Sequence, residues 1–318
     1  MSVSLHVILG TGPVGCWIAH ALCDMGHEVR AINRTGRRSA LMPSPVDVVA
    51  ADAFDSAALI AAAGRASVIY QALNPAYHRW HQDFPALQSS ALDAAHAAHA
   101  RYVSIDNLYM YDASSTMTED SLVAPRSRKG ALRARMAEEV WSAHELGDVR
   151  VAVLRSSDYF GPGVTVSAMA DMVFGNLLKK KKAQVLGSAT QPHSWAYIED
   201  VGRAAAMLGT SEDALGHTWI APHTAPRTQR EMVERACKAM GMPMRMSVIS
   251  PFMLRLAGLF NAGAREMVEM SYEFTAPFVV NSTRIQRTFA MSPTPLDEAI
   301  ERTVRWYKWY KARRGTPV

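Results

Sequence analysis

Short apolar runs alternate with amphipathic segments along the first half of the chain. The segments between the apolar runs predict helices over Cys16–Met25, Ser56–Ala63, Phe84–His99 and Gly130–His144. The apolar runs themselves predict strands over Leu5–Leu9, Glu28–Ile32, Val46–Ala50, Val68–Ala72, Arg101–Ile105 and Val149–Leu154. This alternation predicts an α/β fold, a doubly wound parallel sheet of the Rossmann type with right-handed crossovers.

The alternation loosens after Gly161–Gly163, where methionine-rich helical patterns become common. Expected elements in this part are a helix over Met169–Leu178, a strand over Ala183–Leu186, and helices over Glu266–Phe274 and Leu296–Lys311. We therefore expect a dinucleotide-binding Rossmann domain over residues 1–164, to which residues 195–221 return. Residues 165–194 and 222–318 are expected to form a smaller, mainly helical lobe that binds the substrate.

The first predicted strand runs directly into a G-x-G-x-x-G turn, Gly10-Thr11-Gly12-Pro13-Val14-Gly15. In a dinucleotide site Gly10 allows the tight turn, Gly12 allows close approach of the pyrophosphate, and Gly15 allows the helix to pack on the sheet. Glycines also occur in ordinary strand–helix turns because they allow positive φ. The place of this turn between a strand and a helix favours the dinucleotide, whose phosphates would lie at the helix N-terminus.

The second predicted strand is followed by Asn33, where an NAD site usually carries an acidic residue for the ribose 2′-hydroxyl. Arg34, Arg37 and Arg38 come next, so cations are present and no carboxylate repels a 2′-phosphate. A guanidinium also matches phosphate oxygens in a bidentate way. This pattern predicts NADP(H), with Asn33, Arg34 and Arg37 among its contacts, and the alternative is a solvated basic loop.

Composition is typical of an enzyme with a large core, at 318 residues, 49% hydrophobic and 20% charged. The net charge of +5 is spread along the chain, and Lys179–Lys182 fits a solvated helix C-terminus, so we expect no nucleic-acid partner. His78 and His81 lack a third ligand, and the three cysteines lack metal spacing. We expect no metal and no membrane span or signal peptide. A cytoplasmic monomer or homodimer with a small-molecule substrate is expected.

Five blocks of the sequence resemble the extended short-chain dehydrogenase/reductase superfamily, and among them the NAD-dependent epimerase/dehydratase proteins. They are the glycine turn, Asp52-Ala53, Ser104–Tyr111, Arg155–Gly163 and His193–Val201, and the resemblance covers nearly the whole chain. It implies contacts of Asp52 and Ala53 with the adenine. It also implies that Ala72 and Asn74 line the cofactor, and that the block containing Ser156 closes over the nicotinamide end.

The catalytic residues of that family are a Ser or Thr, a Tyr, and a Lys four residues after the Tyr. Tyr111 resembles the tyrosine of the family's V-Y-G, and counting back from it places Asn107 at the Ser/Thr position. Counting forward from Pro125 places Lys129 at the Tyr position and Arg133 at the Lys position. No Tyr-x-x-x-Lys occurs in the predicted helix over Gly130–His144 or just before it, so the chain resembles an atypical member that lacks the usual motif at this place.

Lys129 and Arg133 are four residues apart, so they share one helix face that would meet the nicotinamide ribose. Burial and the like charge of Arg133 would favour release of a proton from the Lys129 ammonium, while Arg133 would hold the ribose or phosphates. Asn107 would donate to a substrate carbonyl. Tyr77 and Tyr109 are alternative acids. The competing interpretation is that Lys129 and Arg133 form a solvated face.

These residues predict an NADP(H)-dependent oxidoreductase that acts on a small apolar or aromatic carbonyl or enone. Some relatives in the isoflavone-reductase-like group work with a lysine and no catalytic tyrosine, which is compatible with this prediction. One alternative is a redox-inactive NADP(H)-binding sensor, similar to nitrogen-repression regulators. A second is a sugar-nucleotide epimerase or dehydratase, which normally needs the tyrosine.

Overall fold

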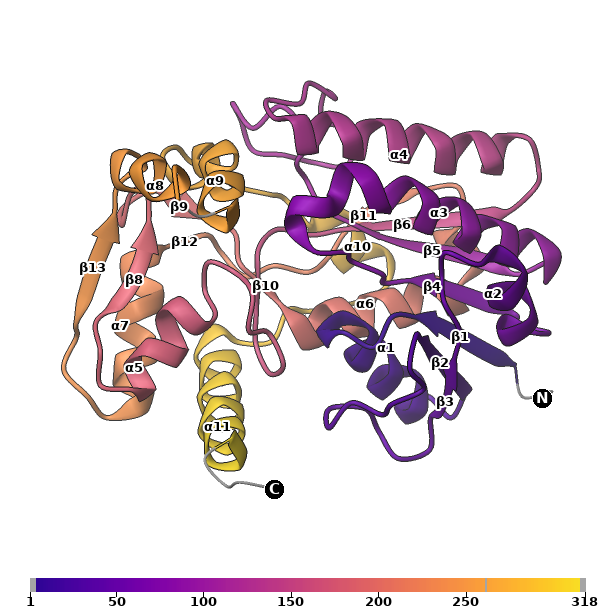
Figure 1. The fold of residues 1–318 in the computed structure, drawn as a ribbon, viewed down its shortest axis with the longest axis horizontal. Helices are drawn as coiled ribbons and strands as arrows, with labels where there is room; N and C mark the ends of the chain where they lie inside the picture. Colours follow the sequence, from indigo (N-terminus) through magenta and orange to yellow (C-terminus); the bar gives the residue numbers. More distant parts are fainter. Residues whose placement is uncertain (1–3, 261, 315–318) are drawn as a thin grey trace.

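A seven-stranded parallel sheet forms the centre of the protein in the computed structural model, which describes residues 4–260 and 262–314 (Figure 1). The strand order is β11-β6-β5-β4-β1-β2-β3, so the order reverses on either side of β1. The strands are β1 (Leu5–Leu9), β2 (Glu28–Asn33), β3 (Asp47–Ala50), β4 (Val68–Gln71), β5 (Arg101–Asp106), β6 (Arg150–Arg155) and β11 (Thr218–Ile220). The predicted doubly wound α/β fold is confirmed, and its ligand crevice is expected at the carboxyl ends of β1 and β4.

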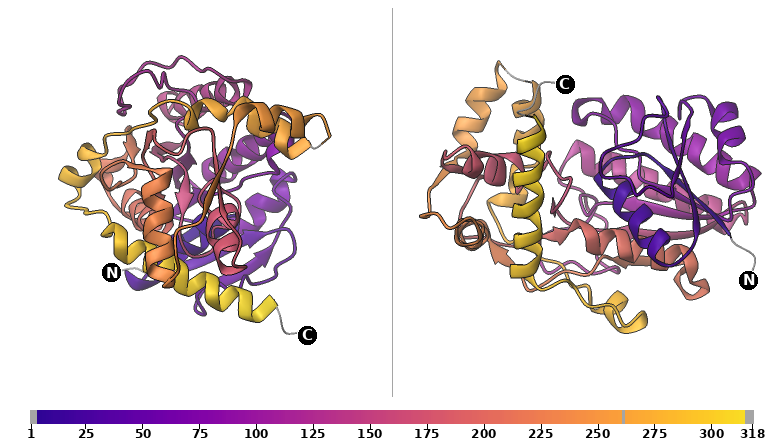
Figure 2. Two further views of the ribbon diagram at one scale, coloured as in Figure 1. Left: turned by 90° about the vertical axis from the view of Figure 1, so that its left-hand side faces the viewer. Right: turned by 90° about the horizontal axis from the view of Figure 1, so that it is seen from below.

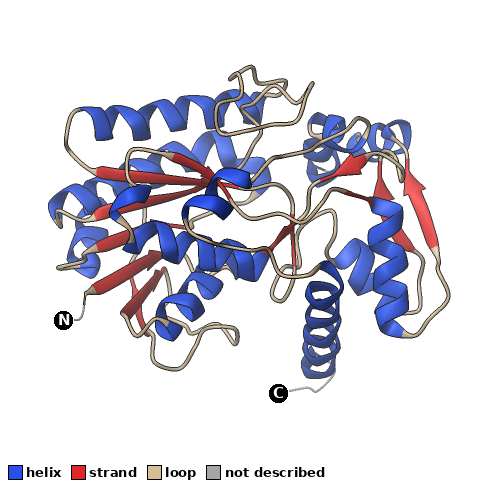
Figure 3. Ribbon diagram, turned by 180° about the vertical axis from the view of Figure 1, so that it is seen from behind, coloured by secondary structure: helices blue, strands red, loops and turns tan. Residues whose placement is uncertain are grey.

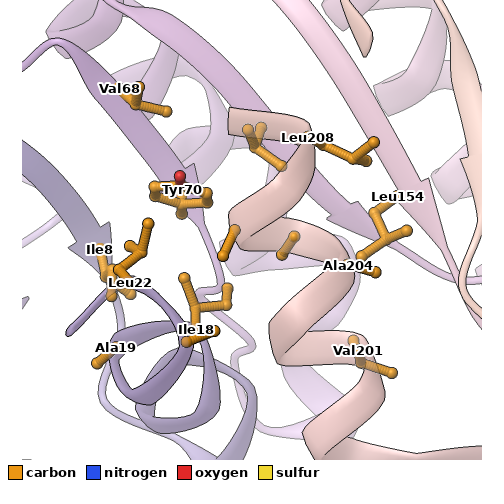
Figure 4. Packing of buried hydrophobic residues seen from close by; sticks show 14 of the residues in the cluster. Ile8, Ile18, Ala19, Leu22, Val68, Tyr70, Leu154, Val201, Ala204 and Leu208 are labelled. Carbon is orange, nitrogen blue, oxygen red and sulfur yellow. The ribbon is translucent and has the colours of Figure 1, made fainter. Parts of the chain in front are cut away.

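Helices cover both faces of the sheet (Figure 3). One face carries α1 (Pro13–Asp24) and α6 (Ile198–Thr210), and the other carries α2 (Ser56–Ala63), α3 (Trp80–Ala97) and α4 (Arg128–Glu145). Side chains of a strand alternate between the faces, so Ile8 packs against α1 and α6 while Val7 and Leu9 face the other layer. Figure 4 shows Ile8 and Tyr70 beside Ile18 of α1 and Ala204 of α6. Both faces are therefore buried, as in other parallel sheets.

A second lobe with its own apolar core lies beside the carboxyl ends of the strands, which point toward it in Figure 1. Figure 2 shows this lobe next to the sheet rather than on either face. Its longer elements are β8 (Ala183–Leu186), α7 (Gln229–Met240), β13 (Met246–Ile249), α8 (Pro251–Gly258), α9 (Ala262–Glu269) and α11 (Leu296–Arg314). Its shorter ones are η2 (Asp171–Gly175), α5 (Asn176–Leu178), β9 (Pro192–His193), β12 (Arg227–Thr228) and η4 (Ser271–Phe274). Helix α10 (Thr283–Thr288) returns to the sheet, where it packs beside β11 and Ile285 joins the core under α1 and α6.

Short elements also lie between the two parts, namely η1 (Tyr77–Arg79), β7 (Tyr159–Phe160) and β10 (Ala196–Tyr197). A further short element, η3 (Glu212–Ala214), joins α6 to β11 at the far end of the sheet. None of the helices within residues 4–260 and 262–314 is long and apolar enough to cross a membrane.

The predicted helix over Glu266–Phe274 is wrong in its second half. Helix α9 ends at Glu269, and a 3₁₀ turn over Ser271–Phe274 follows it. In one continuous helix Glu269 and Glu273 would share a face, because residues four apart are neighbours. The break separates them, so that Glu269 reaches Lys129 while Glu273 is buried.

Other helix predictions differ at their boundaries or in type, and α3 begins at Trp80 rather than Phe84. The first helix begins at Pro13 rather than Cys16, because a proline in the first turn has no N–H to leave unpaired. The helix expected over Met169–Leu178 is a π-helical turn followed by the short α5. Gly175 lies where these join, and glycine weakens a regular helix.

His6 on β1 is a buried histidine that predicts pH-dependent stability. Its Nδ1 lies 2.9 Å from the Tyr70 hydroxyl, and burial, with smaller effects of His27 and Arg101, lowers the pKa of His6 to about 4. As pH falls below about 6.5 the unfolded chain binds a proton that the folded chain does not, so stability is lost. The free energy of unfolding should therefore fall by about 1.4 kcal/mol per pH unit through His6 between about pH 6 and 4.5.

Urea unfolding of the native chain and of His6→Gln across that pH range measures this effect. Glutamine keeps hydrogen-bonding groups but does not titrate, so the free energy of unfolding of the variant should fall less steeply as the pH is lowered. Equal slopes for the two proteins would contradict a neutral, buried His6.

Candidate dinucleotide and catalytic site

The glycine turn has the geometry of a dinucleotide cradle. Gly10 has φ +102°, and a Cβ there would lie 2.9 Å from the Ala72 carbonyl oxygen. A Cβ on Gly15 would lie 2.0 Å from the Gly10 oxygen, so the fold itself requires both glycines. Gly12 differs, because a Cβ there would meet no atom within 4 Å. The space at Gly12 is therefore open to a ligand.

The start of α1 fits the negative charge of a pyrophosphate. Gly12 is the N-cap and provides no side-chain cap, and Pro13 follows as the first helical residue. The first N–H groups of a helix have no partner within it and carry the positive end of its dipole. Thr11, Val14 and Gly15 complete this end of the helix, so the six residues of the turn are suited to hold a dinucleotide pyrophosphate.

The loop after β2 is fastened to the glycine turn by Asn33. Its Nδ2 donates to Thr11 Oγ1 and to the Arg37 carbonyl, both at 3.0 Å, and its Oδ1 accepts from the Thr35 N–H. Arg38 donates to carbonyl oxygens within the loop. Arg34 and Arg37 are exposed, and residues 33–46 contain no carboxylate. Two guanidinium groups are thus left at the surface beside the turn.

The residues expected around the adenosine lie along the same edge of the sheet. Asp52 and Ala53 come just after β3, and Asp52 is exposed while Ala53 is buried. Ala72 and Asn74 come just after β4, where the Ala72 N–H donates to the Leu9 carbonyl at 3.0 Å. Their contacts with a cofactor stay a prediction.

Asp106, the last residue of β5, binds two arginines at the end of the site away from the glycine turn. Arg133 Nε donates to Asp106 Oδ1 at 2.8 Å, and Arg155 Nε lies 3.3 Å from Oδ2, with all three side chains buried. Ser156 N donates to the Asp106 carbonyl at 3.2 Å, and its hydroxyl donates to Tyr159. Because Asp106 contacts it, Arg133 has a carboxylate counter-charge in the interior.

The sequence pattern did not single out Asp106. An acidic residue at the end of an otherwise mainly apolar strand was a usable signal for it.

Lys129 is buried in the first turn of α4 and also has carboxylate partners. Its Nζ donates to Glu266 and, at 3.2 Å, to Glu269, both on α9 of the second lobe. It also lies 4.5 Å from the centroid of the Tyr77 ring. Because Lys129 and Arg133 are both buried, they do not form a solvated face. The two glutamates place negative charge beside the Lys129 ammonium group, whereas the sequence suggested only the like charge of Arg133 nearby.

The other candidate side chains lie in the loops after β4 and β5. Asn107 Oδ1 accepts from the Tyr109 N–H at 3.1 Å. The side-chain nitrogen of Asn107, Nδ2, has no hydrogen-bond partner within the described ranges. Burial, followed by the effect of Glu273, raises the pKa of both Tyr77 and Tyr109. These phenols are therefore suited to donate hydrogen bonds rather than to release protons.

The structure brings Asn107, Lys129, Tyr77 and Tyr109 to one edge. A Cβ on Gly130 would lie 2.3 Å from the Tyr109 carbonyl, so α4 presses closely on the loop after β5. The Tyr77 and Tyr109 rings both contact Trp80. No group of three or more His, Cys, Asp or Glu residues suited to a metal occurs in the part of the chain that the structure describes.

Comparison with known proteins supports the same interpretation of the fold. Residues 7–220 match the NAD dependent epimerase/dehydratase family. A dTDP-glucose 4,6-dehydratase of Neisseria gonorrhoeae is 23% identical over 219 residues, which are 67% of this chain and 60% of that enzyme. The match thus spans less than two thirds of that enzyme's length.

Solved structures share the fold at low sequence identity. An epimerase of Methanothermobacter thermautotrophicus has a TM-score of 0.81 at 14% identity, covering 98% of this chain and 95% of its own. The UDP-glucuronic acid 4-epimerase of Bacillus cereus, solved with UDP-glucuronic acid and NAD, has a TM-score of 0.76 at 16% identity, covering 96% and 99%.

The family match covers the sheet from β1 to β11, together with the glycine turn and the loops that carry the candidate site. Lys129 and Arg133 stand where the resemblance places tyrosine and lysine. The chain belongs to the NAD dependent epimerase/dehydratase family of extended short-chain dehydrogenases/reductases, as an atypical member with Lys129 and Arg133 in α4 where the family has Tyr and Lys.

Proposed function

We propose that this protein binds NADP(H) and catalyses hydride transfer to or from a small carbonyl-containing substrate. The observation that carries the proposal is the open turn at Gly12 next to a loop with exposed Arg34 and Arg37 and no carboxylate. A 2′-phosphate adds two negative charges that guanidinium groups bind well. An acidic residue, which would favour NAD instead, is absent from residues 33–46.

The bound cofactor would supply the hydride, and the residues of this chain would bind and orient the reactants. Asn107 has amide hydrogens available for a carbonyl oxygen. Tyr77, Trp80 and Tyr109 provide an aromatic surface at the same edge, which favours an apolar or aromatic substrate over a strongly polar one. Tyr77 and Tyr109, with raised pKa values, are suited to hold a substrate oxygen by hydrogen bonds, and Lys129 lies beside Tyr77.

Arg34→Ala should weaken NADPH binding by about tenfold or more while leaving NADH binding nearly unchanged. Charge-assisted hydrogen bonds of this kind contribute about 1.5–3 kcal/mol. Quenching of protein fluorescence, titrated with each dinucleotide, measures both affinities. Arg65→Ala is the matched control, because Arg65 is an exposed arginine that precedes β4 at the opposite edge of the sheet. Equal affinity of the native protein for NADH and NADPH would contradict the assignment.

Hydride transfer itself is tested with NADPH deuterated at C4 and a panel of aldehydes, ketones and enones. Transfer of the label to a product, analysed by mass spectrometry, would support the oxidoreductase. An NADP(H) sensor is the second candidate, favoured by the ion pairs that hold both Lys129 and Arg133. It predicts tight NADPH binding and no labelled product.

A sugar-nucleotide epimerase or dehydratase is the third candidate, and the named relatives favour it. The chain has Lys129 at the position where such enzymes have the catalytic tyrosine, and this argues against the third candidate. Isothermal titration with dTDP-glucose and UDP-glucuronic acid separates it from the first proposal, which predicts no binding of either compound at micromolar concentration.

A further inference from the structure

Helix α8, which follows β13, exposes large apolar side chains instead of burying them. Phe252 is 74% exposed, and Phe260, just beyond the end of the helix, is 89% exposed. Met253, Leu256 and Leu259 are each more than half exposed. Figure 1 shows α8 at the outer end of the second lobe, with α9 between it and the central sheet. Exposed apolar faces of this kind mark contact surfaces.

The apolar positions of α8 form two stripes, and only one of them is covered. Leu254 and Gly258 are four residues apart, so they share a face of the helix, and both are buried. A Cβ on Gly258 would lie 3.2 Å from Arg265 Cα, so this face packs closely on α9. The exposed stripe has the same four-residue spacing, at Phe252, Leu256 and Phe260. It has no covering element in the part of the chain that the structure describes.

The exposed stripe lies within a stretch of chain that carries only positive charge. No Asp or Glu occurs from residue 235 to residue 265, a stretch that contains four arginines and one lysine. Arg255 on α8 and Arg265 on α9 are exposed, and neither forms an ion pair within the described residues. Lys179–Lys182, which are also exposed, come just before β8, the strand that pairs with β13. The apolar stripe is thus accompanied by exposed cations.

The sign of this charge decides between the surfaces able to cover the stripe. In a symmetric contact between two copies of the chain the same patch meets itself, so cations such as Arg255 would approach like charges. Like charges brought together across an interface are unfavourable. An anionic lipid surface supplies the opposite charge, and it accepts aromatic and aliphatic side chains without a matching shape. Charge complementarity therefore favours the lipid surface over a second copy.

Helix α8 is already in the form that such a contact needs. Ser250 caps it, with its hydroxyl accepting from the Met253 N–H at 3.2 Å, and Pro251 is its first residue. An interfacial helix lies in the plane of the membrane surface, with its apolar side chains at the boundary between headgroups and acyl chains. A contact of this kind is peripheral and needs no membrane-spanning helix. Because the helix is formed in advance, binding does not require this segment to fold.

We propose that this protein attaches to anionic membrane surfaces through the exposed stripe of α8, with Arg255 and Arg265 as contacts to the lipid headgroups. The apolar side chains of the stripe leave water when they enter the membrane interface, which favours attachment. The positive charge of the region, including Lys179–Lys182, attracts the protein to negatively charged lipids. This inference goes beyond the proposed hydride transfer and does not depend on it.

Flotation of the full chain with lipid vesicles tests the attachment. We expect the native protein to bind vesicles of phosphatidylcholine with about 30% phosphatidylglycerol, and to bind pure phosphatidylcholine vesicles about tenfold less tightly. Added salt should weaken the binding, because it screens the attraction between the cations and the headgroups. A native protein that binds neither kind of vesicle at low salt, or binds both equally, would overturn the proposal. An acidic protein partner would then fit the same face better.

Substitutions on α8 test the assignment to this face. Phe252→Ser and Leu256→Ser should each weaken vesicle binding by about tenfold or more, since each removes a large apolar side chain from the contact. Leu146→Ser is the matched control, because Leu146 is 78% exposed at the end of α4, outside the second lobe. Thermal unfolding midpoints report whether each variant keeps the fold. Unchanged binding in both α8 variants, or an equal loss in Leu146→Ser, would overturn the assignment.

A charge variant and a test for self-association complete the experiment. Arg255→Gln should weaken binding to the anionic vesicles by about fivefold and leave binding to neutral vesicles unchanged, whereas Arg65→Gln should change neither. Analytical ultracentrifugation without lipid tests the competing occupant. A stable dimer of the native chain that Phe252→Ser dissociates would show that a second copy covers the stripe, and would overturn the membrane proposal. None of these measurements uses a substrate, so their outcome leaves the proposed function untouched.

Discussion

Gly12→Val is expected to reduce NADPH affinity by about 100-fold or more without unfolding the protein. Gly12 has φ −70°, which valine adopts easily, and the space around its missing Cβ is empty. The branched side chain would occupy the path by which a pyrophosphate reaches the start of α1. Loss of even one or two charge-assisted hydrogen bonds, at about 1.5–3 kcal/mol each, accounts for this factor.

Fluorescence titration with NADPH measures the affinity, and the thermal unfolding midpoint reports the fold. Gly15→Ala is the informative counterpart, because its Cβ would lie 2.0 Å from the Gly10 oxygen and should destabilise the turn itself. A Gly12→Val protein with native NADPH affinity would show that the turn serves only the fold.

Asp106→Ala is expected to lower the free energy of unfolding by about 3–5 kcal/mol. Asp106 is the carboxylate partner of both Arg133 and Arg155, and each of the three side chains is no more than 5% exposed. Removal of this carboxylate leaves two guanidinium groups in the interior without a counter-charge. The variant should also lose the placement of the Arg133 side chain in the second turn of α4, since Asp106 holds that side chain in position.

Urea unfolding of the native protein and of Asp106→Ala at neutral pH measures the difference in the free energy of unfolding. Asp112→Ala removes a comparable Asp–Arg pair, with Arg126, at the surface, where exposed pairs contribute about 1 kcal/mol or less. Equal losses in the two variants would contradict the structural importance of the buried network.

The sequence alone was sufficient for six of the seven strands of the sheet and for the glycine turn, while the short β11 was not predicted. The strand over Leu5–Leu9 and the helix over Ser56–Ala63 lie where their patterns predicted them, because hydrophobic periodicity is a local property. The geometry at Gly10 and Gly15 likewise agrees with the roles expected from their spacing. Local sequence also placed the candidate residues after β4, β5 and β6 at one edge, since parallel strands end together.

The tertiary structure decided the electrostatic environment of that edge. Lys129 and Glu269 are 140 residues apart, and Asp106 and Arg133 lie on separate elements. Sequence spacing carries no information about such pairs, so it suggested a repulsive Lys129–Arg133 pair where the fold provides a carboxylate for each cation. Burial also depends on long-range packing, because a side chain such as Glu273 is removed from solvent only when elements distant in the sequence pack around it. The sequence therefore determined where the chemistry is placed, and long-range packing determined which groups are charged there.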